Sequence, residues 1–380
     1  MRDWHTHVYT STYTADVSGV CSAMYELGGM TVLHDPSGCN STYTTHDEPR
    51  WYDSKSLMFV SGLDELTAVY GDDSVLINDV KKAAEDLKPR FITLCGASIP
   101  HIIAFDYRGT ARLIEKETGI PVLPVATDGL KSYVSGVDLA LREWIRRFAD
   151  ETEEPVKNCI NLLGVTPIDF SGPANVKAMK KTFEDLGFTV NGCFAMEDSF
   201  ENLTHAYRAS VNVAVSSAGL KTARYMKARK NIPYVVGLPV GKYMAGRMAD
   251  AILQAQEDGR NRTAFDERTE GDILVIGEEV YAKSMAEAVS RTGFAAGRGL
   301  AAAALWPDTD EGLDEDDLYD RVNRSQIVIC DPLFFNVFAD EKTKMIELPH
   351  EGYSGRIFRD RIPVFASGEF DAEAFIERGK

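Results

Sequence analysis

The sequence lacks long hydrophobic runs. None of its 380 residues belongs to a stretch approaching the ~20 consecutive apolar residues that a membrane-spanning helix needs. The first residues, MRDWHTHVYTSTYTADV, also lack the basic and then apolar segments of a signal peptide. We therefore predict a cytoplasmic protein without a membrane partner.

Basic residues are in short supply. The 41 lysines and arginines face 58 aspartates and glutamates, which gives a net charge of −17, and no basic stripe stands out. A negative surface repels the phosphate backbone, so nucleic acid is not expected as a partner. The motif Gly-x-x-x-x-Gly-Lys-[Ser/Thr] is also missing, so the chain is not expected to bind ATP through a P-loop.

Cysteine is sparse as well. Six cysteines are too few for a disulfide scaffold, and in a reducing compartment they are buried, reactive or metal-bound thiols. The gaps between Cys21, Cys39 and Cys95 match no zinc-finger or ferredoxin spacing. Two interpretations stay open for these three: buried core thiols, or ligands of an iron–sulfur cluster held by separate loops. The other three, Cys159, Cys193 and Cys330, are predicted to be buried.

What the sequence does contain is a repeated α/β pattern. Two polar, acidic stretches at 150–155 and 256–272 are interpreted as linkers, which divides the chain into lobes 1–150, 156–256 and 272–380. In each lobe short β-branched runs alternate with segments of helical periodicity, a pattern typical of parallel strands joined by crossover helices. We predict an α/β protein with three Rossmann-like lobes and parallel sheets.

The expected elements can be placed along the chain. Strands are predicted at 30–34, 91–94, 121–125, 159–165, 211–215, 234–236, 273–276 and 326–330. Helices are predicted at 15–27, 76–87, 176–186 and 281–289.

Two of the three cysteines follow predicted strands. Cys95 comes directly after the strand at 91–94 and precedes Gly96, while Cys39 ends the loop HDPSGC, where Gly38 permits a close turn. Ligands of open parallel sheets bind at the carboxyl ends of the strands. Both thiols are therefore expected at a functional edge, and Cys21, on the predicted helix 15–27, could reach the same place.

The order of these segments resembles nitrogenase component 1 proteins. Residues 29–39 (GMTVLHDPSGC) are similar to the strand and Gly-Pro-x-Gly-Cys loop of that family. Further similar segments follow in the family's order: SGLDELTAVYG at 61–71, Cys95-Gly96, TDGL at 127–130, 161–164, the helix at 176–186 and IPY at 232–234. The resemblance spans nearly the whole chain and is strongest over residues 15–140.

The resemblance implies a function. The superfamily includes light-independent protochlorophyllide reductase and nickel-sirohydrochlorin reductive cyclase, and its three N-terminal cysteines, matched here by Cys21, Cys39 and Cys95, hold a cluster near a subunit interface. It implies an oxidoreductase that carries a 4Fe-4S or larger P-cluster-like double cluster, with Gly38 and Gly96 beside it. Electrons would come from an ATP-dependent iron-protein reductase. Three thiolates cannot complete a four-iron cluster, so the missing ligand would come from Asp35, a solvent species or a second chain. A homodimer or a paired homologous subunit is the economical solution.

The chain departs from the family pattern at several positions. Asp35 stands where the loop commonly has glycine, and is either an oxygen ligand of the cluster or a turn-capping carboxylate. Ser216-Ser217 replaces the second-lobe cysteine that holds the large cofactor of catalytic nitrogenase, and the chain is also shorter, so dinitrogen reduction is not expected. The stretch HEGYSG, which holds His350 and Tyr353, is similar to the family's His-x-x-x-Tyr-Ser-Gly but one residue shorter.

The substrate is expected in the cleft between lobes. Ser216, Ser217, His350 and Tyr353 are candidates there, with His350 as a cavity residue or axial ligand and protons delivered by His or Tyr. An ordinary loop histidine is the alternative for His350. Surface or structural roles are expected for His5, His7, His34 and His46. Two other functions stay open: a non-catalytic scaffold for metal-cofactor assembly, and a metal-free Rossmann-like binding protein.

Overall fold

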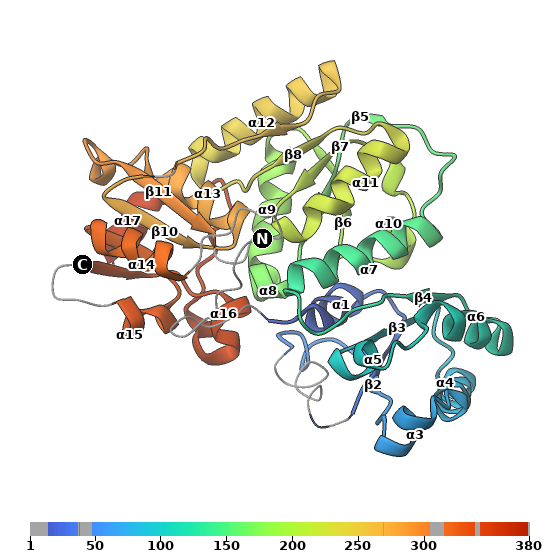
Figure 1. Cartoon of the computed structure of the whole chain (residues 1–380). Coiled ribbons are helices and arrows are strands. Elements are labelled where there is room, and N and C mark those ends of the chain that lie inside the picture. Colours follow the sequence, from blue (N-terminus) through green and yellow to red (C-terminus); the bar gives the residue numbers. More distant parts are fainter. Residues whose placement is uncertain are drawn as a thin grey trace.

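Three separate parallel β-sheets organise the molecule, one for each predicted lobe (Figure 1). The computed structural model describes residues 14–36, 38, 48–268, 270–304, 315–338 and 343–378. Every strand pair within these sheets is parallel, and helices connect the strands. The predicted fold class is confirmed. None of the helices in the described ranges has the length and hydropathy to cross a bilayer.

The first sheet has the strand order β2-β1-β3-β4. Its strands are β1 (Met30–His34), β2 (Leu57–Val60), β3 (Ile92–Gly96) and β4 (Val122–Pro124). The accompanying helices are α1 (Asp16–Met24), α3 (Glu65–Tyr70), α4 (Ser74–Leu87), α5 (Ser98–Ile102), α6 (Tyr107–Thr118) and α7 (Tyr133–Phe148). Residues of β1 and β3 are all buried, as expected for central strands covered on both faces.

The second sheet has the order β6-β5-β7-β8-β9. Its strands are β5 (Val156–Leu163), β6 (Thr189–Cys193), β7 (Ala209–Ala214), β8 (Tyr234–Val236) and β9 (Arg262–Thr263). The α-helices are α8 (Pro167–Phe170), α9 (Pro173–Asp185), α10 (Phe200–Leu203), α11 (Leu220–Lys230) and α12 (Gly241–Asp258). The stretch 256–272 therefore contains the end of α12 and an edge strand of this sheet.

The third sheet has the order β11-β10-β12-β13. Its strands are β10 (Ile273–Gly277), β11 (Leu300–Ala304), β12 (Ile327–Cys330) and β13 (Lys344–Glu347). The helices are α13 (Glu279–Val289), α14 (Glu315–Arg324), α15 (Phe335–Phe338), α16 (Glu351–Ser354) and α17 (Ala372–Arg378). After α16 the chain returns to the second lobe, where Phe365 and Ala366 donate backbone hydrogen bonds to Asn175 Oδ1 at 2.9 and 3.1 Å.

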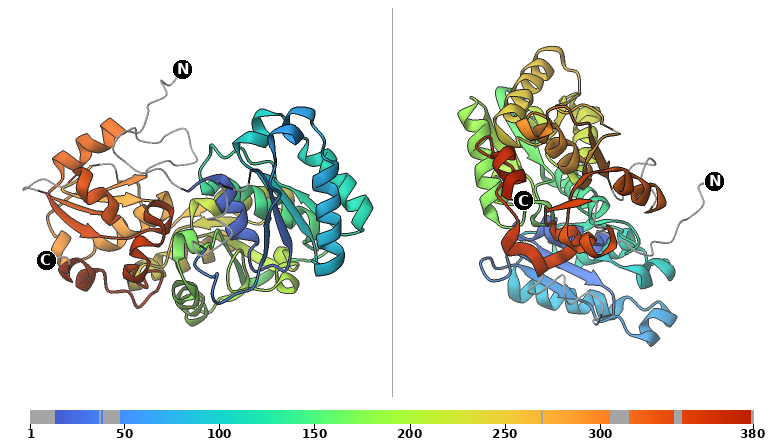
Figure 2. Two further views of the ribbon diagram at one scale, coloured as in Figure 1. Left: turned by 90° about the horizontal axis from the view of Figure 1, so that it is seen from below. Right: turned by 90° about the vertical axis from the view of Figure 1, so that its left-hand side faces the viewer.

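Helix α1 lies at the centre of the molecule. The first and second sheets are packed side by side with the third to one side, and α1 runs between them (Figures 1 and 2). It crosses α7 at very close range: a Cβ added at Gly19 or Gly136 would overlap backbone atoms of the opposite helix, at Tyr133 and Asp16 respectively. These two glycines allow the crossing, and the crossing positions Cys21.

Candidate functional site

Cys21 of α1 and Cys95 of β3 lie side by side in the interior. Both side chains are buried, and they are hydrogen-bonded to each other. The Cys95 Sγ atom also lies 3.8 Å from the carbonyl oxygen of Val32. The hydrogen bond with Cys21, followed by burial, raises the pKa of Cys95 well above its usual value. Two thiols far apart in sequence thus form one sulfur pair.

The sheet edge around this pair is tightly built. Register pairs Cys95 with Leu33 and Gly96 with His34 across β1 and β3. A Cβ at Gly96 would overlap the Tyr107 hydroxyl and lie 2.6 Å from the His34 carbonyl oxygen, so only glycine fits. The side chain of His34 is buried, burial lowers its pKa, and its Nδ1 is 2.9 Å from Ser61 Oγ. Its surroundings are those of a structural histidine.

Acidic groups surround the sulfur pair. Asp16 is fully buried and accepts hydrogen bonds from the backbone N–H groups of Asp128 and Gly129 at 3.0 and 2.9 Å. Burial raises the pKa of Asp16 to about 6. The negative charges of Asp16 and Asp35 also contribute to the raised pKa of Cys95. Metal binding would have to displace thiol protons in this acidic setting.

Three buried hydroxyl groups of the first sheet and its covering helices have no hydrogen-bond partner among the described residues. Tyr107 Oη, which touches the Gly96 position, is one of them, and the others are Thr31 and Thr93 on adjacent strands. Buried donors are normally satisfied. Sulfur atoms of an iron–sulfur cluster accept such hydrogen bonds, and thiolates are the usual cluster ligands. The two buried thiols and the unpartnered Tyr107 hydroxyl are therefore of the chemical kind that such a cluster uses.

The third predicted ligand is not tested by the structure. Cys39 lies outside the described residues, as do His5, His7 and His46, while the neighbouring Gly38 is exposed. Within the described ranges, no group of three or more His, Cys, Asp or Glu side chains is arranged to hold one metal ion. The structure thus brings two of the three predicted cysteines together. Cys159, Cys193 and Cys330 are buried, as predicted.

Beyond residue 47 the chain is anchored by a buried arginine. Arg50 donates to Glu48 and Glu26, and to the carbonyl oxygens of Ser22 and Ala195 at 2.8 and 3.0 Å. Its guanidinium also lies 4.7 Å from the centre of the Tyr25 ring. Arg50 therefore ties the chain that begins at Glu48 to α1 and to the second lobe.

A second buried network joins all three lobes through His350. The backbone N–H of Gly352 donates to His350 Nδ1 at 3.0 Å, so Nε2 carries the proton and donates to Asp169 Oδ1 at 3.2 Å. The hydroxyl of Tyr133 donates to the same carboxylate oxygen. Because Tyr133, Asp169 and His350 come from the first, second and third lobes, this network marks the lobe junction.

The other predicted cleft residues are also packed in the interior. Ser216 Oγ donates to the Gly164 carbonyl oxygen at 2.9 Å and accepts from the N–H of Ala218, while the Tyr353 ring packs edge-on against Phe334. The N–H of Ser217 donates to Glu278 at 2.8 Å. The side chains of Ser216 and Tyr353 therefore face protein partners, whereas the buried Ser217 hydroxyl has no hydrogen-bond partner among the described residues. The predicted roles of these residues in chemistry stay predictions.

Glu278 is a junction residue that sequence reasoning missed. It follows β10 directly, and its carboxylate accepts hydrogen bonds from the N–H groups of Ser217 and Tyr281 at 2.8 and 2.9 Å. Burial, and then the charge of Asp169, raise the pKa of Glu278 to about 7. Its position after a buried third-lobe strand was the available signal.

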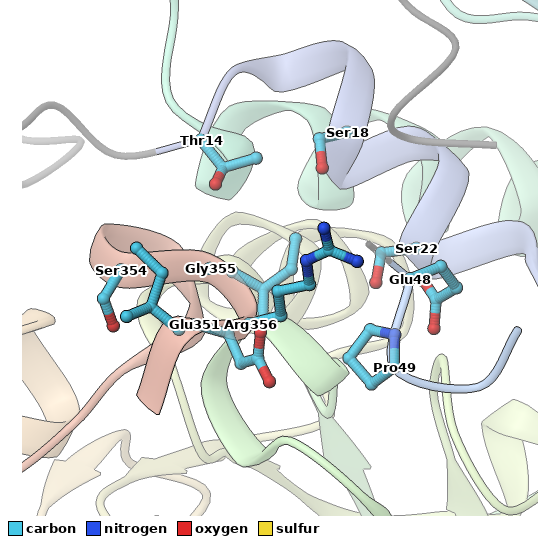
Figure 3. Close-up of a pocket in the computed structure, with 11 residues that line it drawn as sticks. Thr14, Ser18, Ser22, Glu48, Pro49, Glu351, Ser354, Gly355 and Arg356 are labelled. Atoms are coloured by element: carbon cyan, nitrogen blue, oxygen red, sulfur yellow. The ribbon is translucent and has the colours of Figure 1, made fainter. Parts of the chain in front are cut away.

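A hollow of about 420 Å³ opens beside the network, between α1, α8 and α16 (Figure 3). We call it the junction hollow. Its lining residues are Thr14, Ser18, Ser22, Glu48, Pro49, Ile168, Glu351, Ser354, Gly355, Arg356 and Ile357. Figure 3 shows the Arg356 side chain extending toward α1. Sequence reasoning missed this lining, although Arg356 directly follows the HEGYSG stretch that pointed to the region.

Comparison with known proteins decides the family. Residues 19–269 match the profile of the nitrogenase component 1 type oxidoreductases. The chain belongs to this family. Its structure aligns with two nitrogenase structures, "Nitrogenase Cp1 at pH 6.5" and "Nitrogenase Cp1 at pH 5". The first alignment has a TM-score of 0.71 at 12% identity and covers 100% of this chain and 94% of the other. The second has a TM-score of 0.64 at 15% identity and covers 99% of this chain and 88% of the other. At such identities these two likenesses show the shared fold.

Curated relatives within the family differ in what their names describe. One is a light-independent protochlorophyllide reductase component from Pelodictyon phaeoclathratiforme, 25% identical over 62% of this chain and 43% of that protein. Another is the nitrogenase iron-molybdenum cofactor biosynthesis protein NifE from Clostridium pasteurianum, which is 24% identical over 58% of this chain and 51% of that protein. A third is the nitrogenase molybdenum-iron protein alpha chain from Methanosarcina barkeri, which is 23% identical over 45% of this chain and 32% of that protein. The chain thus spans about half or less of each relative.

Proposed function

We propose that the chain is the cluster-bearing component of a nitrogenase-like reductase. In this proposal it accepts electrons from an ATP-dependent iron–sulfur reductase through an iron–sulfur cluster, and the substrate is reduced at the junction hollow. The observation that carries the proposal is the pairing of Cys21 with Cys95 at the edge of the first sheet. Membership of the family supports it.

Cys21 and Cys95 are the proposed thiolate ligands, together with Cys39. A bound cluster would supply one-electron transfer. Gly96 allows the Tyr107 hydroxyl to approach the end of β3 closely, and this buried hydroxyl has no hydrogen-bond partner among the described residues. Because the pKa of Cys95 is raised, this thiol would release a proton on cluster uptake, which makes uptake weaker as the pH falls.

The junction hollow is the proposed substrate site. Its volume lies in the range of small-molecule sites, and side chains from different lobes line it. Ser18 and Ser22 offer hydroxyl groups from α1, the helix that also carries Cys21. Helix α1 would therefore link the electron donor to the substrate, while Arg356 supplies a positive charge from the opposite wall.

A second copy of the chain, or a homologous subunit, is the proposed partner at the first lobe. Large apolar side chains lie exposed on the segments that follow the strands of this sheet: Tyr52 (83%), Leu66, Val69 (75%), Tyr70 (80%), Ile102 and Leu130. We call this set the apolar rim. Exposed apolar side chains that form a patch mark interaction surfaces, and the proposal takes the apolar rim as such a surface. A four-iron cluster needs ligands beyond three thiolates, and a partner docked on the rim could supply them.

A cofactor-assembly scaffold is the second candidate. It is favoured by His350, whose two ring nitrogens are both engaged by protein groups in the closed network with Gly352 and Asp169. Ser216 is likewise closed by hydrogen bonds to backbone groups. The similarity to a cofactor biosynthesis protein agrees with this candidate. In a scaffold the hollow would hold a precursor without turnover.

Iron and acid-labile sulfide analysis of the anaerobically reconstituted chain tests the cluster. We expect about two or more irons per chain with visible charge-transfer absorption, and a loss of more than half of both signals in Cys21→Ser and Cys95→Ser. Cys330→Ser, which removes a buried thiol from the third lobe, is the matched control. Fewer than about two irons, without visible absorption, would instead favour the metal-free binding protein.

Turnover separates the enzyme from the scaffold. The loaded chain is mixed with an ATP-dependent iron-protein reductase, ATP and a tetrapyrrole or low-potential acceptor. Steady-state reduction that is lost in Cys95→Ser and retained in Cys330→Ser supports the enzyme. A fully loaded chain that transfers its metal to an acceptor protein but reduces nothing supports the scaffold.

A further inference from the structure

A second hollow lies at the outer edge of the first sheet, where α6 and α7 both pack on β4. Its volume is about 500 Å³. Four arginines line it, Arg108 and Arg112 from α6 and Arg146 and Arg147 from the last turn of α7. We call it the arginine hollow. None of its lining residues belongs to the junction hollow, and the proposed reductase function does not use it.

The floor of the arginine hollow is held in place by Glu115. One oxygen of this carboxylate accepts a hydrogen bond from the N–H of Val122 at 2.9 Å, and the other pairs with Arg147 at 2.9 Å. Glu115 therefore connects α6 to β4 and to α7, and it holds Arg147 against α6. On α7, Arg146 pairs with Glu143.

The same contacts prevent the edge strand from accepting another strand. Glu115 already occupies the N–H of Val122, and Pro124, the last residue of β4, has no N–H to donate. Proline and satisfied donors are common means of blocking strand addition. The hollow is thus not suited to an extended peptide that pairs through its backbone.

The charge of the arginine hollow is opposite to that of the chain. Four arginines face two glutamates, whereas the whole chain carries a net charge of −17. Arg108 and Arg112 lie four residues apart, so they share one face of α6, and neither has a carboxylate partner in the described part of the chain. A local positive region in an acidic protein attracts anions and repels cations.

We propose that the arginine hollow binds a small polyanion with two or more phosphate groups. Guanidinium groups match phosphate oxygens with paired, charge-assisted hydrogen bonds. Arg108 and Arg112 of α6 would hold one phosphate, and a second would lie against the ion-paired Arg146 and Arg147 of α7. The volume suits a small molecule rather than a protein segment. Inorganic pyrophosphate and a nucleoside diphosphate share this chemistry and are the two sources to distinguish.

Isothermal titration of the full chain at low salt tests the site, with pyrophosphate, ADP and orthophosphate as probes. We expect saturable binding of pyrophosphate at least about tenfold tighter than that of orthophosphate, because two phosphates engage more guanidinium groups. Affinity for ADP equal to or below that of pyrophosphate identifies the diphosphate as the recognised group. ADP binding at least about tenfold tighter identifies a nucleotide site.

Matched variants distinguish binding in the arginine hollow from an effect of the total charge of the protein. Arg112→Gln should weaken pyrophosphate binding at least about fivefold. Arg224→Gln removes the same charge from an exposed position on α11 and should change binding less than about twofold. Thermal unfolding of both variants checks that they fold.

Three outcomes would overturn the proposal. The first is the absence of saturable binding by any of the phosphate probes. The second is an equal effect of Arg112→Gln and Arg224→Gln, since that would indicate screening by total charge. The third is binding of polyglutamate alone, which would assign the arginines to an acidic protein partner. None of these results bears on cluster content, so the reductase proposal is tested separately.

Discussion

At the residue scale, burial changes the chemistry of single carboxyl groups. Asp16 beside the cysteines and Glu278 at the lobe junction are both removed from water, and the pKa of each is raised, to about 6 and about 7. Both carboxylates are used as hydrogen-bond acceptors for backbone N–H groups. Desolvation outweighs those hydrogen bonds because each group is enclosed by packed protein.

Glu278 leads to a pH prediction. In the unfolded chain its carboxyl loses the proton near the ordinary value of 4.5, whereas in the folded chain it keeps the proton up to about pH 7. The unfolded state therefore binds fewer protons between these values, and stability of the wild type falls as the pH rises through this window. Glu278→Gln removes that loss, which amounts to at most about 3 kcal/mol.

Denaturant unfolding of the wild type and Glu278→Gln at pH 4.5, 6 and 8 measures the effect. The difference in unfolding free energy should move in favour of the variant as the pH rises. Glu279→Gln, which removes the neighbouring carboxyl that pairs with Lys283 near the surface, controls for the loss of an acid at this helix end. A difference that stays constant across pH would contradict the prediction.

At the element scale, the crossing of α1 and α7 decides where Cys21 lies. The helices approach so closely that Gly19 and Gly136 leave no room for a methyl group. The same crossing carries Asp16, whose carboxylate receives two N–H groups from the loop before α7. A small separation of the two helices would therefore move Cys21 away from Cys95.

Gly136→Ala tests this crossing. The added methyl group would overlap the backbone of Asp16, which cannot move aside as a flexible side chain can. We expect a loss of about 2 kcal/mol or more in unfolding free energy, and a lower iron content after reconstitution. Gly246→Ala in α12 is the control, because nothing lies within 4 Å of the new methyl group.

The two glycine variants should behave in opposite ways. Gly246→Ala should keep the iron content of the wild type and raise stability by about 0.5–1 kcal/mol, because alanine is the better helix former. Thermal unfolding and iron analysis measure both properties. Equal stability of the two variants would show that the helices can separate without cost.

At the scale of the whole molecule, three lobes meet through buried polar contacts as well as apolar packing. Arg50 connects α1 to the second lobe, and the carboxylate of Asp169 receives Tyr133 and His350 from the other two. These groups are paired with one another in the interior, where a lost partner leaves a costly uncompensated group. The lobes are thus held in one arrangement.

The apolar rim leads to a prediction about assembly. Val69→Glu places a charge on α3, a helix with no buried residue, and should shift a dimer toward monomer by raising its dissociation constant at least about tenfold. Leu253→Glu makes the same change at an exposed position on α12 and should leave the assembly unchanged. Size-exclusion chromatography with light scattering reads out the mass. A cluster-loaded wild type that is monomeric would exclude the proposed dimer.

The sequence by itself determined the class of fold and the position of Cys95 at the carboxyl end of a strand in the first sheet. Strands at 30–34 and 234–236 have their predicted bounds, because both are short, mostly apolar runs that lie largely buried inside their sheets. Strands β2, β6, β9, β11 and β13 were not predicted, and β9 falls within the stretch 256–272 that was expected to be a linker. Residues in β2, β6 and β13 are partly exposed, and β11 is rich in alanine, so hydrophobic patterns are weak there.

Only the tertiary structure decided what surrounds each polar residue. Local sequence made Ser216, His350 and Tyr353 candidates for the cleft between lobes, and the structure shows which hydrogen-bond and ring partners pack around them. The partner of His350 is Asp169, which belongs to another lobe and follows a different strand. Hydrogen bonds between lobes leave no periodic trace along the chain, since they depend on how three separate sheets are brought together.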